Sequence, residues 1–182
     1  MTTIADKTEV LPAGTWKADP AHSRVEFAVN YLGGTFRGVF SPFEAELRVS
    51  EGGEATLTGV ARAESVRVQD ENLEAHLLSP EFFDSERTPE LTFTSTDIRT
   101  QGEAVEIGGE LTVRGTAQPV QLRGTVRPPI GAYGQQRIGI TVETQVDRTA
   151  FGLNWNAPLD DGTPALANDV LLTAELFFIK EQ

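Results

Sequence analysis

The stretch from Ile138 to Asp147 reads IGITVETQVD, and its alternation decides the fold class. Successive side chains of a β-strand point to opposite faces, so a period of two places one face against a core and the other in water. The same alternation recurs in residues 105–114, 120–127 and 170–179. The second half of the chain is therefore predicted to form half-buried β-strands.

The first half of the chain follows the same period less strictly. Residues 25–31, 35–50, 55–63 and 91–98 are expected to be extended, with a turn at Gly33 and Gly34. Pro42 interrupts the longest of these stretches, which predicts one bent strand or two shorter ones. In total the sequence predicts about eight or nine strands.

Residues 70–79 lack the alternation and contain good helix formers. Leu73, His76 and Leu77 stand at positions i, i+3 and i+4, which share one face of a helix. We predict a short helix here, which Pro80 helps to end. Closely spaced strands with a single helix favour a β-barrel or sandwich over a parallel βαβ sheet, and closure would remove exposed strand edges. We favour an all-β barrel with the helix across one end.

Length and composition limit the classes of protein. A chain of 182 residues suits one domain, and the absence of cysteine excludes disulfides and thiolate metal sites. A formal net charge of −12 disfavours nucleic acid and anionic lipid surfaces as partners. No secretory signal pattern can be read at the start, and no apolar run approaches the roughly 20 residues of a membrane helix. We expect a cytoplasmic protein without a stable membrane anchor.

Two parts of the chain are expected to behave differently. Residues 1–13 carry no periodic pattern and are predicted to form a flexible N-terminal arm, whereas residues 14–182 are predicted to form the barrel domain. Several inward positions of that barrel carry small side chains: Ala55, Gly59, Ala61, Ala63, Gly109, Gly124 and Ala174. An eight-stranded barrel can be filled by its own side chains or hold one small ligand. Small residues at inward positions are compatible with either, because they could face large phenylalanines across the interior.

Several stretches, in order along the chain, resemble the YceI family of polyisoprenoid-binding, lipocalin-like barrel proteins. They are Trp16, Asp19–Ser23 with Val25, Phe27 and Val29, Gly38–Phe40, His76–Asp84, Pro89, Phe93–Thr96, Gly109–Gly115, Asp147–Arg148 and Phe151–Leu153. The resemblance implies a single eight-stranded antiparallel barrel with a short helix near one end. It also implies an apolar pocket for an isoprenoid chain, such as a quinone tail or a prenyl phosphate, and a homodimer. It implies no enzymatic activity and no cofactor.

The chain differs from the family pattern at two places. Leu73 and Glu74 stand where an Arg-Asp pair is usual, and Tyr31 stands where a histidine is frequent. We therefore expect the tail of a ligand to be recognised more strongly than its headgroup. The ligand-binding residues that we predict are Phe27, Val29, Tyr31, Phe36, Phe40, His76, Leu77, Phe82, Phe83, Phe93, Leu111, Arg148, Phe151 and Trp155.

Three polar residues each have two interpretations. His76 could hydrogen-bond a headgroup oxygen or serve the fold, and His22 is interpreted mainly as a turn-stabilising residue. Arg148 could pair with an anionic headgroup or form a salt bridge with Asp147 or Asp84.

Three hypotheses for function follow from the residues and the resemblance. The first is binding, storage or transport of an isoprenoid lipid in the barrel. The second is an enzyme that acts on an apolar substrate in the same pocket with His76 as the base. The third is a structural or stress protein with a filled barrel. We predict no catalytic residues and no metal site, because His22 and Ser23 are adjacent and would point to opposite faces of a strand, and because no local spacing brings metal ligands together.

Overall fold

The structure, a computed structural model, describes residues 11–182. Within these residues the chain forms one α-helix, two short 3-10 helices and 11 strands. The helices are α1 (Glu71–Leu78), η1 (Ala63–Ser65) and η2 (Arg148–Phe151). The strands are β1 (Gly14–Ala18), β2 (Arg24–Tyr31), β3 (Gly34–Phe40), β4 (Phe43–Val49), β5 (Ala55–Arg62), β6 (Val66–Arg67), β7 (Glu90–Gln101), β8 (Ala104–Val113), β9 (Thr116–Ala132), β10 (Gln135–Asp147) and β11 (Leu166–Lys180).

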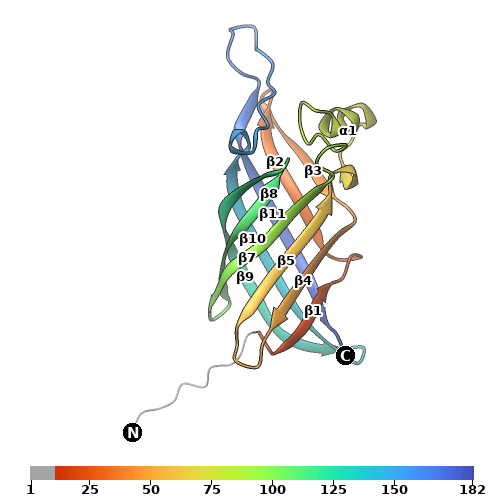
Figure 1. Ribbon diagram of the computed structural model, residues 1–182, viewed down its shortest axis with the longest axis vertical. Coiled ribbons are helices and arrows are strands. Elements are labelled where there is room, and N and C mark those ends of the chain that lie inside the picture. Colours follow the sequence, from red (N-terminus) through yellow and green to blue (C-terminus); the bar gives the residue numbers. More distant parts are fainter. Residues whose placement is uncertain (1–10) are drawn as a thin grey trace.

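All strands belong to one antiparallel sheet that closes on itself. The order is β1-β4-β5-β7-β8-β9-β10-β11-β2-β3-β6, and β1 also pairs with β11. β11 makes this closure with two partners: its first part pairs with β2, and its last residues pair with β1. We call the end of the barrel near β1 and the C-terminus the lower end, and the end near α1 the upper end (Figure 1).

The 11 strands make up eight long ones, because three are interrupted. β1 continues into β2 after a turn at residues 19–23, and β3 continues into β4 across Ser41 and Pro42. β5 and β6, with η1 between them, pair with the long strand formed by β3 and β4: Ala61 of β5 pairs with Phe43, and Val66 of β6 pairs with Phe40. The prediction of an eight-stranded antiparallel barrel is confirmed, as is the break at Pro42.

Local chemistry explains the first interruption. The Asp19 carbonyl accepts hydrogen bonds from the backbone N–H groups of His22 (3.3 Å) and Ser23 (2.9 Å). The Asp19 carboxylate lies 2.6 Å from His22 Nδ1 and accepts the Ala21 N–H at 2.9 Å. These two hydrogen bonds, His22 first, lower the pKa of Asp19. His22 thus has the turn-stabilising contact that we predicted.

α1 occupies the segment predicted to be helical. The Asp70 carboxylate caps its start by accepting the N–H groups of Asn72 (2.8 Å) and Leu73 (3.2 Å). At its end the Ser79 hydroxyl donates to the His76 carbonyl (2.6 Å), just before Pro80. The helix lies beside the upper end of the barrel, as Figure 1 shows.

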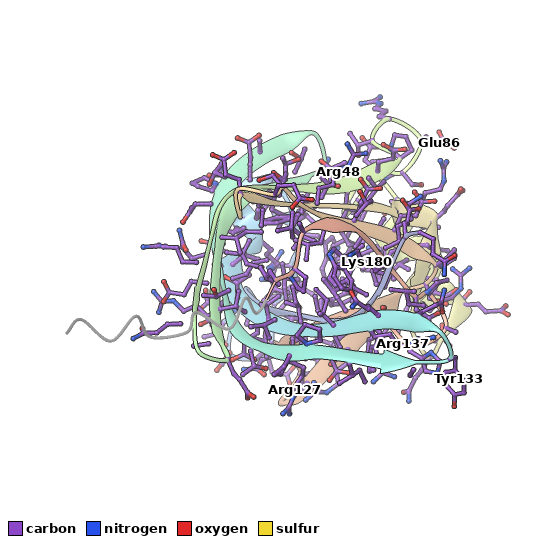
Figure 2. The ribbon with its side chains drawn as sticks, turned by 90° about the horizontal axis from the view of Figure 1, so that it is seen from below. Arg48, Glu86, Arg127, Tyr133, Arg137 and Lys180 are labelled. Carbon is purple, nitrogen blue, oxygen red and sulfur yellow. The ribbon has the colours of Figure 1, made fainter. Side chains whose placement is uncertain are left out.

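The lower half of the barrel is filled. A cluster of completely buried side chains occupies it, including Trp16, Leu47, Ile107, Ile140 and Phe178, each 0% exposed. Lys180 lies within the outline of the barrel when it is viewed from below, and its ammonium is 5.9 Å from the centroid of the Trp16 ring (Figure 2). We use the name lower plug for the part of this buried cluster that fills the lower half of the barrel, including Trp16, Leu47, Ile107, Ile138, Ile140 and Phe178.

The predicted N-terminal arm falls largely outside the described residues. Of residues 11–13, Leu11 packs against the lower plug, and the Pro12 carbonyl accepts the Trp16 indole N–H at 3.0 Å. Contacts with the barrel therefore begin before Gly14.

Candidate functional site: an apolar cavity in the upper half of the barrel

A cavity of about 320 Å³ occupies the upper half of the barrel. On β10, Val142, Thr144 and Val146 line it, whereas Ile138 and Ile140, on the same inward face, belong to the lower plug. The same change occurs along β11, where Leu176 lines the cavity and Phe178 does not. Small-molecule sites typically measure about 300–1,000 Å³, so this cavity is large enough for one ligand.

All residues that we predicted for a ligand site lie in the wall of this one cavity. They come from four strands, two helices and two loops, and they are Phe27, Val29, Tyr31, Phe36, Phe40, His76, Leu77, Phe82, Phe83, Phe93, Leu111, Arg148, Phe151 and Trp155. The structure thus brings them together around a single space.

The wall also contains aliphatic residues that the sequence interpretation did not select. They include Leu57, Leu91, Val113, Val120, Leu122, Val142, Val146, Leu153, Leu172 and Leu176. Alternation shows that such residues face inward, but it does not show how high they lie in the barrel. Height is what separates a wall residue from a residue of the lower plug.

Only some of the small inward residues line the cavity. Gly59, Ala61 and Ala174 do, whereas Ala55, Ala63, Gly109 and Gly124 do not. A Cβ atom at Gly124 would meet the Thr141 carbonyl oxygen of the neighbouring strand, and one at Gly109 would meet the Phe93 ring. These two glycines therefore allow close approach of neighbouring groups and do not create empty space.

Three aromatic rings meet at the upper end of the cavity. The centroid of the His76 ring lies 4.9 Å from that of Phe82 and 5.0 Å from that of Trp155, both in edge-on geometry. Phe82 and Trp155 are themselves 5.4 Å apart. His76 Nε2 lies 2.5 Å from a carboxylate oxygen of Glu81, so this ring nitrogen is already engaged within the protein. His76 thus has both a cavity-facing position and a structural partner.

Arg148 is buried at the same end, and carbonyl oxygens accept all of its N–H groups. Nε donates to Ala167 (2.8 Å), and Nη1 donates to the backbone carbonyls of Leu153 (2.6 Å) and Trp155 (2.8 Å). Nη2 donates to the backbone of Leu166 (3.3 Å) and the side chain of Asn168 (3.4 Å).

Of the two interpretations of Arg148, this geometry decides only the salt bridge, and the pairing with an anionic headgroup stays a prediction. The salt bridge to Asp147 or Asp84 is absent, because the Asp147 carboxylate accepts the Thr149 hydroxyl (2.6 Å) and N–H (2.9 Å) and no ion pair of Arg148 occurs within residues 11–182. Burial lowers the pKa of the Arg148 guanidinium, opposed by the charge of Asp147. All five N–H donors of Arg148 are hydrogen-bonded within the protein, so this side chain joins η2 to the segment 153–168.

Residues 11–182 hold no group of three or more histidine or acidic side chains arranged to bind a metal ion. Among their helices, none has the length and apolar character needed to cross a bilayer.

The fold and the cavity define a class of protein: a closed, eight-stranded antiparallel barrel that encloses an apolar space at one end. Residues 16–178 match the family model of the YceI-like domain. The chain belongs to this family, as its resemblance in sequence predicted.

Staphylococcal proteins are among the curated relatives. A UPF0312 protein of Staphylococcus epidermidis is 26% identical over 167 residues, which cover 88% of this chain and 94% of the relative. A UPF0312 protein of Staphylococcus aureus is 27% identical over the same length and with the same coverage.

Solved structures share the fold. BcnA of Burkholderia cenocepacia superposes with a TM-score of 0.73 at 21% identity, covering 88% of this chain and 98% of BcnA. The YceI protein of Campylobacter jejuni gives 0.68 at 21% identity, covering 80% and 85% of the two chains. A polyisoprenoid binding domain of Saccharophagus degradans gives 0.66 at 15% identity, covering 91% and 98%.

Proposed function

We propose that the protein binds an isoprenoid lipid in the upper half of the barrel and stores or carries it. The observation that carries this proposal is the cavity of about 320 Å³ with a wall made almost entirely of aliphatic and aromatic side chains. Water in such a space finds few hydrogen-bond partners, whereas an apolar chain gains contacts with the wall.

The energetics favour a branched hydrocarbon chain as the ligand. Burial of one methylene contributes about 0.8 kcal/mol, so an isoprene unit contributes roughly 3–4 kcal/mol before the costs of ordering and docking. A few units suffice for tight binding. The tail therefore supplies most of the affinity in this proposal, and the headgroup supplies little.

The polar wall residues suggest how the ligand is oriented. Among these residues, Tyr31, His76 and Arg148 lie toward the upper end, whereas the opposite end of the cavity meets the apolar lower plug. We infer that the tail points down and the headgroup stays near α1. The headgroup is of the quinone or prenyl phosphate type, and the engaged donors of Arg148 favour the neutral quinone.

The comparisons support the proposal from two sides. The chain belongs to the YceI-like family, and one structural neighbour is itself described as a polyisoprenoid binding domain. The homodimer and the cytoplasmic location stay predictions from the sequence.

The enzyme hypothesis has less support, since the ring of His76 is engaged by Glu81 and no serine or threonine hydroxyl is hydrogen-bonded to that ring in residues 11–182.

A pair of tryptophan substitutions on β10 tests the proposal. Thr144 faces the cavity and its neighbour Gln145 is exposed on the outer face of the same strand. Thr144→Trp fills the cavity and should abolish binding of an added prenyl quinone in isothermal titration calorimetry, while Gln145→Trp should bind like the parent. Lipid extracted from the purified parent with organic solvent should give isoprenoid masses that the Thr144→Trp protein lacks.

The contrary result is equally well defined. A parent protein that contains no lipid and takes up neither a prenyl quinone nor a prenyl phosphate would refute the proposal. Equal binding by Thr144→Trp and the parent would place the lipid outside this cavity. Chemical conversion of a bound lipid that is lost in His76→Gln, with binding retained, would favour an enzyme instead.

A further inference from the structure

We propose that Leu57, Val142 and Leu176 form a floor that sets the length of isoprenoid chain the protein accepts. The inference rests on the proposed function and deepens it, because it names the feature that selects among isoprenoids. It follows from where the cavity stops.

On the neighbouring strands β10 and β11 the cavity stops within one inward residue of the same level. On β10 the inward residue Val142 lines it and the next inward residue below, Ile140, does not. Ile140 pairs with Leu176 of β11, which is the lowest residue of that strand in the wall. On β5 the corresponding step lies between Leu57, which lines the cavity, and Ala55, which does not. The lower boundary is therefore continuous across the barrel.

The space beneath the floor is closed to a ligand. Leu57, Val142 and Leu176 belong to the same buried cluster as the lower plug, and they are 3%, 2% and 5% exposed. Below Val142 on β10 the next inward residue Ile140 is 0% exposed, and below Leu176 on β11 Phe178 is also 0% exposed. Protein interiors pack as densely as organic crystals, so a chain cannot advance past this level without displacing side chains.

A cavity that is closed at its lower end binds short and long isoprenoid chains with different affinities. Each added isoprene unit buries more apolar surface until the tip of the chain reaches the floor. A further unit must then remain outside the cavity, where it gains little. We expect affinity to rise along a series of isoprenoid alcohols and then to level off, with the position of the plateau fixed by the floor.

The test compares two truncations of equal size at different heights. Leu176→Ala opens the floor into the ligand cavity. Ile138→Ala also removes three carbon atoms, but from the lower plug, where Ile138 pairs with Phe178 and neither residue lines the cavity. Geraniol, farnesol, geranylgeraniol and solanesol are titrated into each protein. We expect Leu176→Ala to bind the first homologue beyond the parent's plateau roughly tenfold more tightly than the parent does, and Ile138→Ala to keep the parent's plateau.

A variant with a larger side chain at the floor should shift the chain length of the plateau in the opposite direction. This variant does not create a new cavity. Ala174 lines the cavity and pairs with Val142 across the β10–β11 ladder. Ala174→Leu raises the floor, so its plateau should come at a shorter chain than in the parent. Both variants are checked for a cooperative unfolding transition before titration.

The outcomes separate this inference from the proposed function. A parent protein that binds no member of the series refutes both. A parent that binds isoprenoids but shows the same plateau in Leu176→Ala and Ala174→Leu refutes the floor alone. An equal shift in Leu176→Ala and Ile138→Ala would also refute it, because position relative to the cavity would then not matter.

Discussion

Arg148 is a buried cation whose partners are all carbonyl oxygens. It joins η2 to the backbone at Leu153, Trp155, Leu166 and Ala167. One side chain thus stabilises the segment 153–168 at the upper end of the barrel. A buried polar group that loses its partner costs about 1–3 kcal/mol, and arginine here serves several acceptors at once. Its contribution therefore lies in the organisation of this segment.

Arg148→Met tests this role while keeping an apolar chain of similar length. We expect the substitution to lower the free energy of unfolding by about 2–4 kcal/mol, since it leaves several buried carbonyls without donors. Urea denaturation measures the loss, and hydrogen exchange should show faster exchange in residues 153–168 than in the lower plug. Arg148→Lys, with fewer donors in a different geometry, should recover only part of the loss. A Met variant as stable as the parent would contradict this role.

The sequence predicted the aromatic residues of the cavity wall but not the structural role of Arg148. The phenylalanines could be predicted because alternation places Phe27, Phe36 and Phe40 on inward positions or because they lie in family-like stretches. The role of Arg148 could not, because its acceptors are backbone carbonyls contributed by a distant segment. A sequence pattern does not show which backbone carbonyls a side chain will contact.

At the scale of elements, the approach of β9 to β10 is unusually close at Gly124. A Cβ atom there would meet the Thr141 carbonyl oxygen and carbon, which are backbone atoms and cannot rotate away. Further along the same strand, a Cβ atom at Gly131 would meet nothing within 4 Å. The two glycines thus share an element and differ only in their surroundings.

Alanine at these two positions gives a matched prediction. Gly124→Ala should destabilise the protein by about 2–3 kcal/mol, because it forces the two backbones apart in a packed wall. Gly131→Ala should stay within about 0.5 kcal/mol of the parent. Urea denaturation of both variants measures the difference. Equal stability of the two would mean that the ladder between β9 and β10 adjusts freely around Gly124.

The elements show what alternation can and cannot predict. It located all the long strands, and the helix pattern located α1 to within a residue or two. Alternation could not separate residues of the cavity wall from residues of the lower plug. The position of a residue along the barrel axis depends on the register between strands, such as the pairing of Val142 with Ala174. Register is set by contacts between segments that are distant in the sequence.

At the scale of the whole molecule, acid should weaken the fold. Hydrogen bonds to the carboxylates of Asp19, Asp147 and Asp161 lower their pKa values: from His22 and Ala21 for Asp19, from Thr149 for Asp147 and from Thr163 for Asp161. A carboxyl group with a lower pKa in the folded state contributes stability above its unfolded pKa and loses it as the pH falls through the folded value. The unfolded chain then binds more protons than the folded one.

We therefore expect the free energy of unfolding to decrease as the pH falls below about 4, with little contribution from these groups above about pH 5. Urea denaturation at a series of pH values measures the decrease. A variant with Asp19, Asp147 and Asp161 all changed to Asn should show a shallower decrease, because amides do not titrate. Stability that rises between about pH 4 and 3 would contradict the assignment.

The three interruptions of the barrel lie side by side in the wall. β1 and β2, β3 and β4, and β5 and β6 are broken in three neighbouring long strands, while β11 next to them runs without a break. Pro42 has no N–H to donate at the middle break. Backbone hydrogen bonds between neighbouring strands are interrupted at these breaks, so the wall is held together by fewer of them here than along β7 to β11.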